Sequence, residues 1–350
     1  MHWMTTYGKV SLCERCLTVA GHRVRPFSEN AHIHCRDYSQ PLQRRLVDFA
    51  SDSSFETASQ KLEEHYGVVV PESSVRAITL GHARCMSEQS KASLQNRQEC
   101  VGDGKQLIGE MDGSMIPVVL FDEKAEGDKR KTRKVDWQEA KLCLVYEQGS
   151  CNKRHRVIMG EPDEAGDQWL SCAIEQGLNR QSSIHCVSDG AKWIASQADR
   201  VFASQGHFLV DYYHLCEYIA DAAKECVGKD EKACQKWTDK QKTRMKTGCS
   251  EKVLAELEPH SNGKSGKEAN KSEECHRYIR NRPGQFDYQA AEAANLPIGS
   301  GEIESSNRSV VQTRLKLPGA WWKPEYAHDM LNLRTLRANG DWDKYWKATG

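Results

Sequence analysis

The sequence predicts a mixed α/β layer fold, in which a central sheet is combined with helices before, within and after it. Between residues 107 and 226, apolar runs with strand character alternate with segments of helical spacing. Two of the apolar runs end in an Asp-Gly pair, and a Gly-Ser-Gly turn late in the chain precedes a helix that carries glutamates. These observations predict a sheet whose strand ends collect acidic side chains.

The sheet region spans residues 105–227. We expect Leu107 to Leu120 to form two strands around a turn at Asp112-Gly113, followed by a third strand. The third strand is expected over residues 140–146. The later elements follow in the order helix, strand, helix, strand, helix, over residues 163–177, 184–188, 191–204, 207–211 and 213–226.

Residues 1–40 are rich in cysteine and histidine. Cys13 and Cys16 form a Cys-x-x-Cys pair, and His34 and Cys35 follow as further ligands of the kind that hold zinc. The second half of this pattern is irregular, because Cys35 has no partner cysteine two or three residues later. A zinc knuckle and a segment without metal are therefore open alternatives.

Residues 41–100 are predicted to be helical. Gly67 lies in a turn, and Ser73 and Ser74 are expected to cap the helix that follows it. This order is that of a helix-turn-helix, although any helical hairpin gives a similar pattern. The three helices are expected over residues 42–50, 55–66 and 75–86.

The end of the chain divides into two segments. Residues 228–295 are polar and charged, with a Gly- and Ser-containing middle, and are interpreted as a helical insertion. Residues 296–350 are interpreted as a closing helix followed by a tail that is rich in tryptophan.

Composition narrows the class of protein. The chain has 350 residues, and its 49 basic and 49 acidic residues cancel, so only local clustering of charge can argue for a nucleic acid. No apolar run is long enough to span a membrane, and the first residues lack a signal pattern, so a cytoplasmic location is expected. The 14 cysteines are then expected to be mostly small buried side chains, without a disulfide framework.

Three acidic residues are the main candidates for chemistry. Asp112 and Asp189 each close an apolar run, and Glu304 lies in the helix after the Gly-Ser-Gly turn. Each Asp-Gly pair alone is most often a plain turn. Together, two strand-end aspartates and a helical glutamate are what a two-metal phosphoryl-transfer site needs, with Mg²⁺ or Mn²⁺ held by carboxylate oxygens.

Three further residues are secondary candidates. Glu302 and Glu304 are two residues apart, so only one can face the sheet, and the face of Glu304 continues through more apolar positions. Glu302 is therefore expected to face solvent. Asp211 and His214 follow the last strand, where Asp211 is either a further sheet-edge carboxylate or simply a helix N-cap.

Two basic clusters are candidates for contact with the phosphates of double-stranded DNA. The first is a loop, and the second follows Glu304 directly. Trp321 and Trp322 could either stack on bases or close a hydrophobic core, and the core is the commoner use of adjacent tryptophans. The two clusters comprise Lys129, Arg130, Lys131, Arg133 and Lys134, and then Arg308, Arg314 and Lys316.

Several motifs together resemble the ISKra4 family of insertion-sequence transposases, which is related to the Mutator-like and IS256-like transposases. The longest of these motifs run from Leu296 to Arg308 and from Arg314 to Trp322. Shorter motifs begin at Asp112, Val187 and Asp211, and the resemblance extends from about residue 34 to Trp346.

The resemblance implies a ribonuclease H-like catalytic domain with an all-α insertion. It implies an acidic triad of Asp112, Asp189 and Glu304, which cleaves DNA at the element ends and joins those ends to target DNA. A Cys-x-x-His motif of the related families is replaced by Asp211-x-x-His214, which leaves the role of Asp211 open. The same resemblance implies a homo-oligomer in the synaptic complex and association with the bacterial nucleoid.

Two other classes of function are consistent with the sequence. One is an inactive transposase remnant or a derived sequence-specific DNA-binding regulator. The other is a repair or processing nuclease that cleaves DNA without strand transfer. Divalent-metal-dependent cleavage separates the transposase from the regulator, and joining of the cut ends separates it from the processing nuclease.

Overall fold

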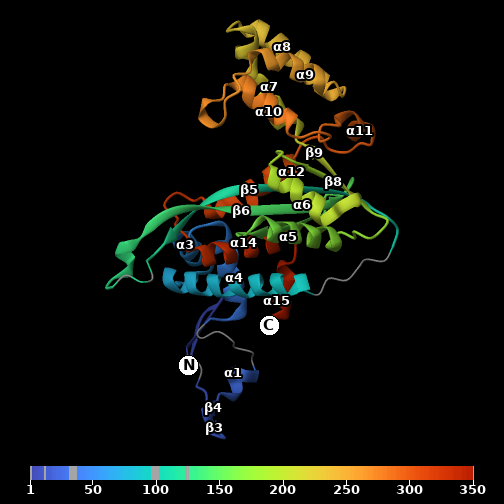
Figure 1. Ribbon diagram of the computed structural model, residues 1–350. Helices are drawn as coiled ribbons and strands as arrows, with labels where there is room; N and C mark the ends of the chain where they lie inside the picture. The colour runs from blue at the N-terminus through green and yellow to red at the C-terminus, as the bar shows by residue number, and fades with distance from the viewer. Residues whose placement is uncertain are drawn as a thin grey trace.

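A five-stranded mixed sheet forms the centre of the computed structural model (Figure 1). The structure describes residues 2–11, 13–30, 38–95, 102–122, 124 and 126–349. The strand order is β7-β6-β5-β8-β9. The five strands are β5 (Gln106–Leu120), β6 (Lys134–Glu147), β7 (Lys153–Ile158), β8 (Ser183–Ser188) and β9 (Gly206–Val210).

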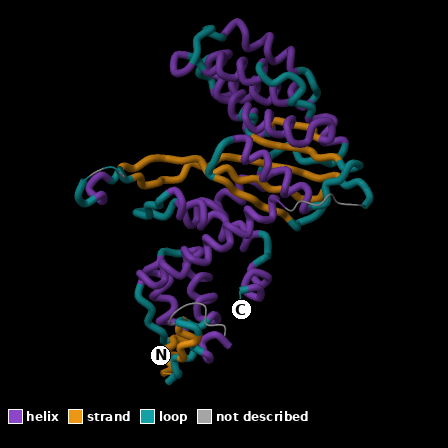
Figure 2. The backbone as a smooth tube through the Cα atoms, turned by 60° about the horizontal axis from the view of Figure 1, so that its bottom comes forward, coloured by secondary structure: helices purple, strands orange, loops and turns teal. Residues whose placement is uncertain are grey.

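β5 organises this sheet. It pairs antiparallel with β6 along its whole length, but it pairs parallel with β8 only from Gln106 to Glu110. The second half of β5 therefore runs past the end of β8, and the β5–β6 hairpin projects from the sheet (Figure 2). The short 3-10 helix η1 (Lys129–Thr132) lies near the tip of this hairpin.

The first three strands differ from the prediction. Leu107 to Leu120 is one continuous strand, because Asp112 and Gly113 stay in the ladder opposite Leu142 and Lys141. β7 was not predicted, since its sequence Lys-Arg-His-Arg-Val-Ile lacks an apolar alternation. Its polar side chains are accommodated by partners from other elements, for example Asn339, which bonds the backbone and ring of His155.

Two helices, α5 (Pro162–Glu175) and α6 (Lys192–Phe202), cover one face of the sheet. Trp169 of α5 is fully buried and packs against Gly109 of β5, where an added Cβ would come within 2.9 Å of the indole nitrogen. The absence of a side chain at Gly109 thus lets α5 approach the sheet closely. Both helices agree with the predicted order.

On the other face, α14 (Pro324–Ala338) packs directly against the sheet, and the N-terminal helices pack against α14 (Figure 1). Their apolar side chains, such as Leu46 and Met330, share one buried cluster with Ile116 and Leu142 of the sheet. The helices are α2 (Gln40–Asp52), α3 (Phe55–Tyr66), α4 (Glu72–Gln95), α14 (Pro324–Ala338) and α15 (Trp342–Ala348).

Local signals explain the ends of the first two of these helices. Ser39 and Ser54 are N-caps of α2 and α3, and Gly67 ends α3 in the left-handed conformation. The prediction that Ser73 and Ser74 cap the next helix was wrong, because α4 already begins at Glu72. The predicted turn and the order of the three helices are confirmed.

A separate helical layer lies beyond β9 and has its own buried cluster (Figure 1). The 3-10 helices η3 (Glu258–His260) and η4 (Gly266–Glu268) lie in the polar middle that the sequence indicated. The helices of this layer are α7 (Tyr212–Val227), α8 (Glu231–Lys246), α9 (Ser250–Leu257), α10 (Lys271–Arg280) and α11 (Tyr288–Ala293).

The chain returns to the sheet through α12 (Gly301–Ser306), which continues as a π-helical segment, η5 (Asn307–Gln312), and α13 (Thr313–Leu315). The N-terminal segment forms two small hairpins, β1 (His2–Thr5) with β2 (Gly8–Ser11) and β3 (Leu17–Val19) with β4 (His22–Val24), followed by α1 (Pro26–Asn30). Within the described ranges, no helix combines the length and apolar character needed to span a bilayer.

Candidate functional site

Acidic side chains gather where β5, β8 and β9 point toward the same edge of the sheet. Asp189 directly follows β8, and Asp211 directly follows β9. Asp112 lies within β5, two residues beyond Glu110, the last residue of β5 that pairs with β8. Because these three strands are parallel to one another, their carboxyl ends bring the aspartates to one side of the sheet.

Asp112 is half-buried and held at both carboxylate oxygens. The Gly113 amide donates to Oδ1 at 2.7 Å, and the Asn307 side chain donates to Oδ2 at 2.6 Å. Burial raises the pKa of Asp112, and the negative charge of Asp189 raises it further. Asp112 was expected in a turn at the end of a strand, but it lies inside a strand and still reaches the same site.

Asp189 lies in a tight turn, as the sequence predicts. Its Oδ1 accepts from the Ala191 amide at 2.9 Å and from the Ser188 hydroxyl at 3.1 Å. Gly190 has φ +81°, a conformation that L side chains rarely adopt. The helical layer fastens this turn, because Tyr278 donates to the Asp189 carbonyl at 2.6 Å and Arg282 donates to the Gly190 carbonyl at 2.7 Å.

Glu304 reaches the site from the first turns of α12, and two buried carboxylates hold the start of this helix. Asp211 Oδ2 accepts from the amide and the hydroxyl of Ser300, at 2.6 Å and 2.5 Å. Glu110 Oε2 accepts from the Ile303 amide at 2.8 Å. Amides at a helix start lack partners within the helix, so both carboxylates satisfy them and fix the position of Glu304.

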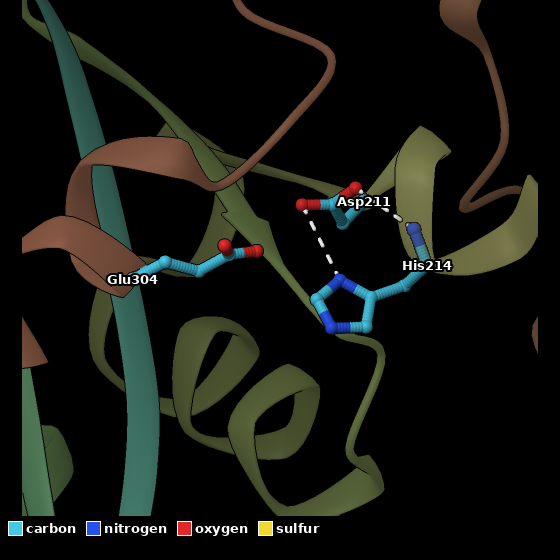
Figure 3. A group of neighbouring side chains, drawn as sticks. All are labelled: Asp211, His214 and Glu304. Atoms are coloured by element: carbon cyan, nitrogen blue, oxygen red, sulfur yellow. Dashed lines mark hydrogen bonds and ion pairs between the residues drawn. The ribbon is translucent and has the colours of Figure 1, made fainter. Parts of the chain in front are cut away.

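Asp211, His214 and Glu304 converge in space (Figure 3). One potential ligand atom from each lies within 4.8 Å of the others. Asp211 is also the N-cap of α7, as the simpler interpretation of the sequence predicted, since its Oδ1 accepts from the Tyr213 and His214 amides at 2.6 Å and 3.2 Å.

His214 carries positive charge within this group. The Asp211 carboxylate lies 3.5 Å from Nδ1 of His214 and is the main reason that the pKa of His214 is raised to about 9, and the charges of Asp189 and Glu304 add to this. Burial works against ionisation of Asp211, but its contacts with His214 and Ser300 together lower its pKa to about 2.

The remaining acids of this site suit a hard divalent cation, but Asp211 and the positively charged His214 have no free lone pair for it. Asp211 already accepts from the amides of Ser300, Tyr213 and His214 and from the Ser300 hydroxyl, which occupy the four acceptor positions of a carboxylate. Asp112 and Asp189 keep acceptor capacity, and the Glu304 carboxylate has no hydrogen bond within the described part of the chain. Oxygen donors of this kind suit Mg²⁺ or Mn²⁺.

Glu302 lies apart from this group. It is half-buried and forms an ion pair with Lys153 of β7, whereas Glu304 lies with Asp211 and His214. The face argument for Glu304 over Glu302 was only partly right, because Ser306 is buried and Arg308 is exposed. The hydroxyl of Ser306 contacts His155 Nε2 at 3.1 Å, and the π-helical segment, which begins at Asn307, shifts the phase only of the residues that follow, including Arg308.

The predicted DNA-contact residues divide by exposure. Lys131, Arg133 and Lys134 are exposed on the β5–β6 hairpin, and Arg308 and Lys316 are exposed after α12. The side chains of Lys129 and Arg130 lie outside the described part of the structure. Trp321 is 46% exposed, whereas Trp322 is buried in the core that the sequence also allowed.

Arg314 departs from the prediction of a surface contact. Only 2% of it is exposed, and its Nε donates to the Ala50 carbonyl at 2.9 Å. Its guanidinium lies over the rings of Phe55 and Trp322, at 4.8 Å and 4.6 Å from their centres. Local charge pattern could not reveal this burial, since α2 and α3 supply the contacts from more than 250 residues away.

The predicted zinc ligands are described only in part. Cys13 and Cys16 are exposed, and both lie in the connection between β2 and β3. His34 and Cys35 fall outside the described residues, so the zinc site stays a prediction.

Sequence reasoning missed the residues that support the acids. Glu110 is fully buried and accepts from the Tyr146 hydroxyl at 3.1 Å as well as from the Ile303 amide, and burial raises its pKa to about 7. Ser300 and Asn307 hold Asp211 and Asp112. The one available signal was a glutamate inside an apolar strand, which rarely occurs without a specific partner.

Fold and site together define a mixed α/β protein with an acidic cluster at one edge of its sheet. Residues 31–347 match the model of a family described as "Uncharacterised protein family (UPF0236)", and the chain belongs to this family. A comparison with curated proteins finds no match.

Among the solved chains that are similar to this one is a chain of the "Drosophila P element transposase strand transfer complex". The similarity covers 92% of this chain and 83% of that chain, with 10% sequence identity and a TM-score of 0.34. At this identity and TM-score, the similarity establishes neither a shared fold nor a shared activity.

Proposed function

We propose that this protein is an insertion-sequence DNA transposase of the ISKra4 type, with Asp112, Asp189 and Glu304 as its catalytic acids. The observation that supports the proposal is geometric: Glu304 converges with Asp211 and His214 beside the edge of the sheet to which the parallel strands direct Asp112 and Asp189. The charge of Asp189 raises the pKa of Asp112, and the charges of Asp189 and Glu304 raise that of His214.

The strand order supports a ribonuclease H-like assignment of the catalytic domain. The first three strands of the sheet form an antiparallel meander, and the fourth and fifth lie parallel to the first on its other side. A ribonuclease H-like sheet has this arrangement. The helical layer from α7 to α11 then corresponds to the all-α insertion that the resemblance implies.

Asp112, Asp189 and Glu304 would hold Mg²⁺ or Mn²⁺, which supplies Lewis-acid activation and neutralises charge at the reacting phosphate when bound. The protein's own residues position these acids. Asn307 orients the Asp112 carboxylate by donating to it. The Asp189 turn is fixed by the hydrogen bond from the Ala191 amide to the Asp189 carboxylate. His214, held by Asp211, places a positive charge beside the acids and reduces their mutual repulsion.

The proposed substrate is double-stranded DNA, namely the element's terminal repeats and the target. The exposed basic residues Lys131, Arg133 and Lys134 would contact the phosphates from the projecting hairpin. A homo-oligomer in the synaptic complex and association with the nucleoid belong to the same proposal.

Substitution of each acid tests the proposal. Asp112→Asn, Asp189→Asn and Glu304→Gln should each abolish cleavage of labelled element-end DNA in Mg²⁺ or Mn²⁺, because a carboxamide cannot supply the same anionic donor. DNA binding, measured by gel shift, should survive in all three variants.

Glu302→Gln is the matched control, since it changes a glutamate of the same helix that pairs with Lys153 instead. It should retain most of the activity. Substantial cleavage by any of the three acid variants would contradict the assignment, and DNA binding by wild-type protein without cleavage would favour an inactive, DNA-binding relative.

A further inference from the structure

A pocket of about 460 Å³ lies beside the projecting hairpin, away from the acids. It forms where the segment around Trp322 runs along β5, with the Val119 amide donating to the Trp322 carbonyl at 2.7 Å. We call it the Trp321 pocket, and the residues that matter to the argument are Phe55, Arg76, Arg133, Arg314, Trp321 and Lys323.

The lining of the Trp321 pocket combines an aromatic surface with positive charge. Trp321 is 46% exposed, whereas its neighbour Trp322 is 5% exposed. The lining includes four basic side chains and one acidic side chain, Glu72. Lys323 has a carboxylate, that of Glu325, at 4.0 Å, but this pair is exposed and therefore weak. An anionic ligand with a flat apolar part matches this combination.

Arg314 adds a second and independent indication of an anionic ligand. Arg314 is only 2% exposed and lines the pocket. Its guanidinium forms no ion pair within the part of the chain that the structure describes. The rings of Phe55 and Trp322 lie against its guanidinium. Burial lowers its pKa to about 10, so the group still carries its charge at neutral pH and makes the wall of the pocket positive.

We propose that the Trp321 pocket binds an unpaired nucleotide of a DNA strand, with the base against Trp321 and the adjoining phosphates near Arg133 and Lys323. This inference rests on the proposed function, which supplies DNA as the ligand. Base–aromatic stacking tolerates any sequence, and flanking cations track the backbone.

The position of the pocket also fits DNA that is bound at the acids. Asp112 and Val119 lie seven residues apart on the same strand, which corresponds to about 23 Å. A duplex that ran along β5 would advance about 3.4 Å per base pair, so this distance corresponds to roughly seven base pairs.

Fluorescence anisotropy with two labelled DNAs tests this inference, without added divalent metal so that no cleavage occurs. One DNA is a duplex with a short single-stranded overhang, and the other is the same duplex with blunt ends. Wild-type protein should prefer the overhang by about tenfold. Trp321→Ala should remove this preference and leave binding of the blunt duplex unchanged, whereas Trp321→Phe should retain most of it.

Trp137→Ala is the matched control, because Trp137 is 55% exposed on the hairpin and does not line the pocket. It should keep the preference. Equal binding of both DNAs by wild type, or equal losses in Trp321→Ala and Trp137→Ala, would overturn the inference. A stronger preference for an RNA overhang would overturn the assignment to DNA. None of these outcomes depends on cleavage, so they are distinct from failure of the transposase proposal.

Discussion

The two Asp-Gly pairs look alike in the sequence but have different physical reasons for their glycine. Gly113 lies in an extended strand, where an added Cβ would meet the end of the Glu139 side chain. Gly190 has φ +81°, and an added Cβ would come within 2.9 Å of both Arg282 Nε and the Tyr278 hydroxyl. Only the second pair therefore needs glycine for its backbone conformation.

Gly190→Ala should lower the free energy of unfolding by about 1–3 kcal/mol, because alanine is strained at this φ and meets the groups that fasten the turn. DNA cleavage should fall as well, since Asp189 moves with its turn. Urea denaturation and a cleavage assay measure the two effects.

Gly67→Ala is the control for Gly190→Ala. Gly67 also has positive φ, +62°, but no atom lies near its added Cβ. The Gly67→Ala substitution should lower the free energy of unfolding by about 1 kcal/mol and leave DNA cleavage unchanged. Equal effects of the two substitutions on cleavage would show that the turn does not position Asp189.

At the scale of elements, the start of α12 decides where Glu304 lies. Asp211 follows the end of β9, and Glu110 lies inside β5. Both are far from α12 in sequence, yet both accept hydrogen bonds from the start of this helix. The π-helical segment that follows turns Asn307 toward Asp112. The continuous segment from α12 into η5 thus connects two of the three acids, because it carries Glu304 and, through Asn307, binds Asp112.

Asp211→Ala should therefore affect both stability and catalysis. It leaves the buried amide and hydroxyl of Ser300 without their acceptor and uncaps α7, at a cost of roughly 3 kcal/mol. The cleavage rate should fall by about 100-fold or more, because Glu304 shifts with the helix start. Thermal unfolding and single-turnover cleavage measure these changes.

Asp230→Ala gives a matched comparison, because Asp230 is an exposed N-cap of α8 that lies in the helical layer. Its loss should cost about 1 kcal/mol without a change in cleavage. If Asp211→Ala cleaves DNA as well as Asp230→Ala does, Asp211 has no role in positioning Glu304.

At the scale of the whole molecule, the two ends of the chain are joined on one face of the sheet. His82 of α4 contacts the Tyr345 hydroxyl of α15 at 2.7 Å and Gln43 Oε1 of α2 at 2.8 Å. Since Gln43 Oε1 only accepts, Nε2 of His82 donates to it and Nδ1 accepts from Tyr345. The neutral imidazole thus connects three helices.

Burial lowers the pKa of His82 to about 4 from its ordinary value of 6.5. The unfolded chain then binds a proton more readily than the folded one between these values, so the contribution of His82 to stability is lost as pH falls from 6.5 toward 4. Over the whole interval from pH 6.5 to below pH 4, the free energy of unfolding falls by roughly 3 kcal/mol on account of His82.

Urea denaturation at pH 7 and pH 5 measures this effect against His82→Gln. Wild-type protein should lose more stability over this interval than the variant, because glutamine does not titrate there. Identical pH dependence in both proteins would refute the role of His82. Carboxylates titrate in both proteins alike and cancel in the comparison.

The sequence by itself determined much of the order of elements. Periodicity and turn residues predicted α5, β8, α6, β9 and α7, and they placed Asp189 after a strand and Glu304 in a late helix. These features depend on neighbours along the chain, which short sequence windows contain. The same windows missed β7, whose sequence lacks an apolar alternation. They also divided β5 into two strands, because pairing with β6 overrides the local turn signal of Asp112-Gly113.

Only the tertiary structure decided which side chains support the acids and which basic residues are buried. Glu110 meets Ile303 and Asp112 meets Asn307 across nearly 200 residues, and Arg314 meets Ala50 across 264. Contacts at such separations depend on how whole elements pack, which local propensity does not encode. Local sequence thus indicates which acidic residues are candidates, whereas long-range packing sets where their carboxylates lie and shifts their pKa values.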